Sequence, residues 1–135
     1  MSQENVEIVR QTIDSINRGD IDGALENATD DFEADWSNSI APGRQGTYSG
    51  KERVREFWRS FAEAFDELRW DPEEIIDVDE SRVIVVNHLH ARGRGSGAAV
   101  EGVSAQLWTI GDGKGRSVKL FQSKAEALEA VGLRG

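Results

Sequence analysis

The sequence SGKERVREFWRSFAEAF, residues 49–65, carries the strongest amphipathic helix pattern of the chain. Its apolar residues recur at three- and four-residue spacing, which places them on one helix face: Val54, Phe57, Trp58, Phe61, Ala62 and Phe65. Ser49 and Glu52 have the spacing of a capping box, which predicts the start of the helix. Because the apolar face is rich in aromatic side chains, we expect this helix to pack against the core.

Two shorter helices and a strand are predicted before this helix. The first helix has one apolar face and ends at Gly19, and its face consists of Val6, Val9, Ile13 and Ile16. Asp20 can cap the second, whose apolar face consists of Ile21, Ala24, Leu25 and Ala28. Strict alternation from Phe32 to Trp36 then predicts a half-buried strand.

Short β-type runs separated by turn signals follow the aromatic helix. They predict four strands joined by hairpin-length loops, at about Leu68–Val78, Arg82–Arg92, Val100–Ile110 and Ser117–Gln122. Ser123 and Glu126 repeat the capping-box spacing and predict a last short helix. Helices segregated from a run of strands indicate an α+β domain with an antiparallel sheet. No linker or repeat divides the chain, so we expect residues 1–135 to form a single domain.

Composition excludes several classes of function. The net charge of −9 argues against a nucleic-acid-binding protein and against attraction to an anionic membrane surface. The chain has no cysteine, which excludes disulfides, thiolate metal sites and a cysteine nucleophile. Because the N-terminal stretch is polar and no apolar run approaches the roughly 20 residues of a membrane span, we expect a cytoplasmic protein.

Several stretches in this order resemble the nuclear-transport-factor-2-like superfamily, and within it the SnoaL-like branch of polyketide-cyclase and ketosteroid-isomerase-like proteins. The stretches are INRGDID (16–22), DDFEADW (30–36), YSGKE (48–52), GRGSG (93–97) and EALEAVGL (126–133). The resemblance implies a cone-shaped, curled antiparallel sheet covered by N-terminal helices around an apolar pocket. It also implies a homodimer packed through the outer face of the sheet, and it implies no cofactor.

The resemblance also allows the steroid-isomerase residues to be tested by position. Two oxyanion donors of that branch, a tyrosine and an aspartic acid, would fall near Thr12 and Gln106 here. Its catalytic aspartate would fall at Trp36, one residue after Asp35. None of the three matches, so the resemblance does not extend to steroid isomerase activity.

A row of four basic side chains alternates along one predicted strand: His88, His90, Arg92 and Arg94. If this face lines the pocket, His88 and Arg92 could bind an anionic ligand, with His90 as a proton shuttle. If it is the convex face, the row forms a polar stripe in solvent or at a dimer interface. Spacing across the hairpin favours the convex face, and a single β-bulge would invert this assignment.

The pair His88 and His90 also has the spacing of two metal ligands on a strand. A metal ion would need a third ligand, such as Glu101 across the hairpin, and the sequence does not fix one. From the sequence alone we therefore expect no metal.

Asp35 is the carboxylate candidate for a catalytic base, since an acid beside a large apolar ring can have a raised pKa. Alternation with Phe32 and Ala34 sends Trp36 inward and Asp35 outward, which favours a solvated carboxylate.

Aromatic residues on several elements could form a pocket with a few polar anchors, which is the usual composition of a small-molecule site. The candidates are Trp36, Tyr48, Trp58, Phe61 and Trp108. Core packing is the alternative, and it is favoured for Trp58 and Phe61. Gln106 is the polar anchor, because an amide among apolar neighbours needs a hydrogen-bond partner.

Two functional hypotheses follow. The first is a pocket protein for a small apolar or aromatic molecule, with Asp35, His90 and Gln106 as candidate residues for cofactor-free proton transfer in cyclisation or isomerisation. The second is a non-catalytic ligand-binding or dimerisation module of the same fold. The facing of His88 and His90 discriminates between the two.

Overall fold

A computed structural model describes residues 2–39 and 45–133 of the chain. Within these residues the chain forms four helices and six strands. The helices are α1 (Ser2–Asn17), α2 (Ile21–Glu26), α3 (Lys51–Ala64) and α4 (Lys124–Ala130). The strands are β1 (Ala28–Asp35), β2 (Thr47–Ser49), β3 (Phe65–Asp77), β4 (Arg82–Gly93), β5 (Ala99–Gly111) and β6 (Lys114–Phe121).

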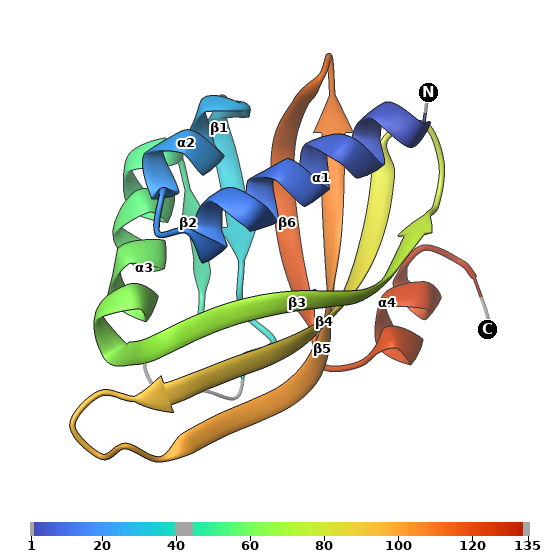
Figure 1. Cartoon of the computed structure of the whole chain (residues 1–135). Coiled ribbons are helices and arrows are strands. Elements are labelled where there is room, and N and C mark those ends of the chain that lie inside the picture. The colour runs from blue at the N-terminus through green and yellow to red at the C-terminus, as the bar shows by residue number, and fades with distance from the viewer. Residues whose placement is uncertain (1, 40–44, 134–135) are drawn as a thin grey trace.

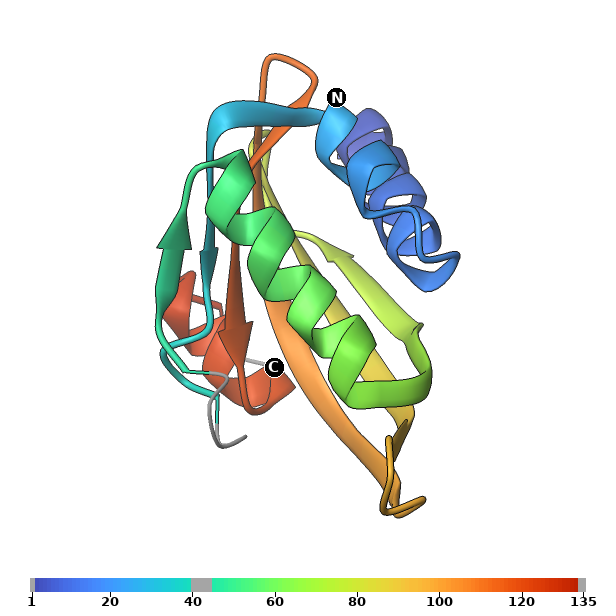
Figure 2. The ribbon, with the colours of Figure 1, turned by 90° about the vertical axis from the view of Figure 1, so that its left-hand side faces the viewer.

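The strands form one curled sheet in the order β2-β1-β6-β5-β4-β3. β3 to β6 are the predicted antiparallel meander, whereas β1 pairs with β6 in parallel. β2 was not predicted, because a strand of three residues is too short to show alternation. Figures 1 and 2 show α1, α2 and α3 on one side of the sheet and α4 on the other. The α+β architecture is therefore confirmed.

Two hydrophobic clusters define the two faces of the sheet. The larger cluster joins α1, α2 and α3 to one face through residues that include Val83, Val85 and Trp108, and we call this the inner face. The smaller cluster packs α4 against the opposite, outer face at Ile84 and Ala105. Consecutive residues of β4, such as Val83 and Ile84, are thus buried on opposite faces of the sheet, as the two-residue period of a strand requires.

The two capping boxes predicted from the sequence have different outcomes. Ser123 is the N-cap of α4, and its hydroxyl accepts a hydrogen bond from the Glu126 backbone N–H at 3.2 Å. Ser49 does not cap α3, whose N-cap is Gly50 with a φ of 90°. Ser49 is instead the last residue of β2 and donates its hydroxyl proton to Glu33 on the paired strand at 3.0 Å. This prediction was wrong because strand pairing fixed Ser49 in an extended conformation.

One carboxylate, that of Asp79, makes several of the hydrogen bonds that hold the turn between β3 and β4. Asp79 accepts hydrogen bonds from the Ser81 backbone N–H at 2.9 Å and from Arg82 Nε and Nη2 at 2.9 and 2.7 Å. Hydrogen bonding to Arg82, followed by the Ser81 backbone bond, lowers the pKa of Asp79 to about 2. This stabilising contribution is therefore complete above the usual pKa of 3.8 and is lost as the pH falls towards about 2.

Replacing Arg82 by glutamine should return the pKa of Asp79 towards 3.8, because the charged donor is removed. NMR titration of the Asp79 carboxyl measures this directly. Arg116→Gln is the matched control, since Arg116 pairs with Asp112 and not with Asp79. An Asp79 pKa that stays near 2 in Arg82→Gln would show that the backbone of the turn, rather than the arginine, sets it.

No helix of the described residues is long and apolar enough to cross a membrane.

Candidate functional site

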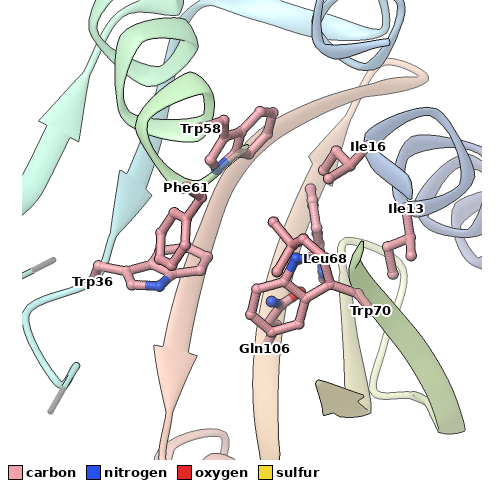
Figure 3. A pocket seen from close by; sticks show the side chains of 9 residues that line it. Ile13, Ile16, Trp36, Trp58, Phe61, Leu68, Trp70 and Gln106 are labelled. Atoms are coloured by element: carbon pink, nitrogen blue, oxygen red, sulfur yellow. The ribbon is translucent and has the colours of Figure 1, made fainter. Parts of the chain in front are cut away.

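A pocket opens between α1, α3 and the inner face of the sheet. We call it the aromatic pocket, and its lining consists of Ile13, Ile16, Trp36, Trp58, Phe61, Leu68, Trp70, Gln106 and Trp108. Figure 3 shows Trp36, Trp58 and Phe61 on one side of it, with Leu68, Trp70 and Gln106 on the other. The cavity inside this lining is small, about 30 Å³, whereas a wider hollow that shares Trp36, Phe61 and Trp70 with it measures about 390 Å³. All four tryptophans of the chain line this pocket.

The aromatic side of the pocket is built by edge-to-face ring contacts of α3 with β1 and with Trp36, the residue that follows β1. Phe61 packs against Trp36 at a centroid distance of 6.5 Å, and Trp58 packs against Phe32 at 5.9 Å. Such T-shaped pairs contribute about 0.5–1.5 kcal/mol each beyond the burial of their area. The rings are therefore held in place by the core on one side, while their other side faces the pocket.

Gln106 lies on the opposite wall. Apart from the indole N–H groups, its amide is the only hydrogen-bonding side-chain group among the described residues that line the pocket. The residue lies on β5 across from Val85 and is only 4% exposed. Among the described residues no hydrogen bond reaches its side-chain amide. Its amide is not among the fully buried side-chain groups that lack a partner, so it borders the space of the pocket, where a bound molecule with a complementary polar group can reach it. The pocket is therefore mainly apolar, and the Gln106 amide is a polar anchor within it.

Trp108 provides a second unpaired donor beside Gln106. Its indole Nε1 is buried and has no hydrogen-bond partner among the described residues. The ring lines the aromatic pocket and is 3% exposed. The Gln106 amide and the Trp108 indole N–H of β5 thus belong to residues that line the same pocket.

A wider hollow, the mouth, adjoins the aromatic pocket. The two share Trp36, Phe61 and Trp70. The lining of the mouth extends along the arm of the β4–β5 hairpin through Leu89, Val100, Gly102 and Ser104. The mouth gives a route by which a small molecule could reach the pocket.

Three members of the predicted basic row, His88, His90 and Arg92, lie on the outer face. Arg94 does not continue the row, because it follows the end of β4 and donates hydrogen bonds to the carbonyls of Ala62 and Glu63 at the end of α3. The β4–β5 pairing shows no register shift, and it places Leu89 opposite Gly102 on the inner face and His88 opposite Val103 on the outer one. The convex-face alternative is therefore the observed one. Arg92 bonds with Glu67 at 3.2 Å and Arg94 with Asp66 at 3.0 Å, so both arginines have carboxylate partners. His88, His90 and Arg92 do not line the aromatic pocket.

Asp35 also points away from the pocket. Its carboxylate accepts hydrogen bonds from the Ser37 backbone and hydroxyl at 3.0 and 2.6 Å, and it lies 3.7 Å from Lys119 Nζ. Burial alone raises the pKa of Asp35, but the bonds from Ser37 and the charge of Lys119 outweigh burial and lower it. The raised pKa expected of a base beside Trp36 is therefore wrong for this carboxyl.

Tyr48 lies behind the pocket wall. Its ring stacks on Phe57 with centroids 4.1 Å apart, and its hydroxyl donates to the Gln45 carbonyl at 3.0 Å. Of the residues predicted from the sequence, the structure brings together Trp36, Trp58, Phe61, Gln106 and Trp108.

Four lining residues were not predicted as site residues: Ile13, Ile16, Leu68 and Trp70. The alternation of Leu68 and Trp70 along β3 could have placed both on one face, as the structure does. Ile13 and Ile16 belong to the apolar face that the helix pattern did identify, and only their packing shows that this face also borders a pocket.

Solved structures share this architecture. A nuclear-transport-factor-2-like protein of unknown function from Burkholderia pseudomallei is 22% identical, with a TM-score of 0.79 over 96% of this chain and 98% of that one. TerC, crystallised with polyporic acid, is 22% identical, with a TM-score of 0.78 over 95% and 98%. A candidate polyketide cyclase from Xanthomonas campestris is 16% identical, with a TM-score of 0.74 over 96% and 98%. No curated protein matches the chain in sequence.

The curled sheet and the covering helices define the nuclear-transport-factor-2-like fold. The sequence model of the SnoaL-like domain matches residues 9–118. The chain therefore belongs to the SnoaL-like family, as the sequence motifs indicated.

Proposed function

We propose that this protein binds a small apolar or aromatic molecule in the aromatic pocket, with its polar group bonded to the Gln106 amide. The position of that amide carries the proposal, because Gln106 is only 4% exposed and its side chain lines the pocket. Ring-lined walls favour a flat ligand, because stacked and edge-to-face contacts add to the burial of its area. The likeness to TerC, which was crystallised with polyporic acid, supports an aromatic ligand.

Binding without acid–base chemistry fits the lining best. No side chain that titrates near neutral pH is among the described residues that line the aromatic pocket, and Asp35 and His90 lie on the outer face. A general base must come within hydrogen-bond reach of the proton that it removes, directly or through one water. We therefore favour the non-catalytic hypothesis over proton transfer by Asp35 or His90.

A cofactor-free cyclase or isomerase is the second candidate function. The family and the likeness to a candidate polyketide cyclase support it. Gln106 and the Trp108 indole N–H could then donate hydrogen bonds to an oxyanion that forms in the pocket. The outer face also remains the predicted surface of a homodimer, where Val103 is a large apolar side chain that is 53% exposed.

Two probes and two variants test the role of Gln106. 2-Naphthol and naphthalene share an aromatic frame, and only the first carries a hydroxyl. We expect Gln106→Leu to weaken the binding of 2-naphthol by roughly 5- to 100-fold, because its buried hydroxyl loses its partner. Naphthalene should bind the variant at least as well as it binds the wild type, since leucine leaves no unpaired amide.

The indole N–H signals of the four tryptophans report occupancy in ¹⁵N NMR titrations, because all four rings line the pocket. Gln11→Leu, at an exposed position of α1, is the matched control and should leave both affinities unchanged. Equal losses for 2-naphthol and naphthalene in Gln106→Leu would contradict a hydrogen bond from this amide. Indole signals that do not respond to either probe would contradict the pocket as the binding site.

A further inference from the structure

Two histidines and a glutamate gather on the outer face, away from the aromatic pocket. His90 Nδ1 lies 3.0 Å from Glu101 Oε1, and His88 Nε2 lies 3.6 Å from the same oxygen. The two imidazole rings stack with their centroids 4.1 Å apart. One donor atom from each residue lies within 4.8 Å of the other two.

Strand geometry fixes this arrangement. His88 and His90 are two residues apart on β4, so both side chains project from the same face. Glu101 is directly opposite His90 on β5, in a stretch of pairing without register shifts. The third ligand that the sequence could not fix is therefore supplied by the neighbouring strand.

The donor set and its spacing suit a transition metal ion. Two ligands held about 2.0–2.1 Å from a tetrahedral Zn²⁺ ion lie about 3.4 Å apart, close to both distances from Glu101. Two imidazoles and a carboxylate are ligands that zinc accepts readily. The side chains of His88, His90 and Glu101 are 33%, 39% and 59% exposed, so an ion can enter and a water can complete its shell.

The surrounding charges are mixed. Asp71 lies opposite His88 on β3 and favours a cation, whereas Arg69 lies opposite His90 and opposes one. Arg92, the next residue of the row, is paired with Glu67. The net charge of −9 adds a weak long-range attraction for cations. These opposing effects predict a moderate affinity rather than a tight structural site.

We propose that His88, His90 and Glu101 bind one divalent transition metal ion per chain, with Zn²⁺ the best match. The ion links β4 to β5 at the start of the hairpin arm. Leu89 lies between the two histidines in sequence, and its pairing partner Gly102 follows Glu101. Both residues line the mouth of the aromatic pocket from the opposite face. Metal binding would thus stiffen the part of the sheet through which a ligand enters.

Calorimetric titration of ZnCl₂ into the protein, purified without a polyhistidine tag, tests the site. We expect one ion per chain, and at least about tenfold weaker binding in Glu101→Gln, since even residues that only orient a ligand contribute that much. The double variant His88→Ala/His90→Ala should lose the site. Glu129→Gln, which removes an equal charge from the exposed face of α4, should bind as the wild type does.

Long-range ¹⁵N NMR of the imidazoles identifies the bound nitrogens. We expect Zn²⁺ to shift His88 Nε2 and His90 Nδ1, the atoms that face Glu101. Binding that the double variant retains, or zinc shifts absent from both imidazoles, would overturn the proposal. A stoichiometry of one ion per two chains would also overturn it, in favour of an ion shared between copies.

Discussion

Replacing Phe32 by alanine should lower the free energy of unfolding by about 3–5 kcal/mol. Phe32 is 1% exposed and packs against Trp58 and Trp108 at centroid distances of 5.9 and 6.3 Å. Its ring also fills the space above Gly115, where an added Cβ would lie 3.4 Å from the ring. Because these neighbours belong to three different elements, they cannot all move to close the cavity.

Guanidinium denaturation with linear extrapolation measures this loss. A loss of this size is a large part of the 5–15 kcal/mol that stabilises a typical domain. If the alanine variant does not fold, Phe32→Leu leaves a smaller cavity and should show an intermediate loss. Phe65→Ala is the control, because Phe65 is only half-buried and stacks on Phe61 at the end of α3. A loss in Phe32→Ala no larger than in Phe65→Ala would contradict a core centred on Phe32.

Replacing Asn87 by leucine should instead raise the free energy of unfolding by about 1–3 kcal/mol. Asn87 is 0% exposed, and its amide nitrogen and oxygen have no hydrogen-bond partner among the described residues. Leucine has the same number of side-chain heavy atoms and a similar branched shape. The substitution therefore removes two unsatisfied polar atoms without leaving a cavity.

Asn17 provides the matched comparison. Its side chain donates to the Trp70 carbonyl at 2.7 Å and accepts from the Trp70 backbone N–H at 2.8 Å. Asn17→Leu should therefore destabilise the protein, because it leaves both backbone groups without a partner. If denaturation shows that Asn87→Leu is as destabilising as Asn17→Leu, then Asn87 has a bonded partner such as a buried water, and the prediction fails.

The helices were predictable from their apolar period, and the late strands from short β-type runs bounded by turn signals. The aromatic face around Trp58 and the strand around Val85 need no knowledge of their neighbours to be recognised. Ser49 shows the limit of local signals, since it has the spacing of a capping box and pairs with β1 instead of capping α3. Ser123 is not part of a strand, and it caps α4 as its spacing predicts.

The candidate site was less predictable, because each side chain's role depends on which face of the sheet it occupies. Spacing across the β4–β5 hairpin favoured His88 and His90 on the convex face, and only the observed register excluded a bulge that would invert them. Gln106 was found because a polar residue among apolar neighbours is a local signal. Trp70 was missed because the facing of its strand depends on the bulges in the β3–β4 pairing.

A crystal structure of the protein with 2-naphthol tests the central claim most directly. The binding of a small molecule in the aromatic pocket predicts the rings of the ligand between Phe61 and Trp70, with its oxygen about 2.7–3.2 Å from an atom of the Gln106 amide. Naphthol bound only on the outer face beside His90, or bound in the pocket with its hydroxyl turned away from Gln106, would contradict the account.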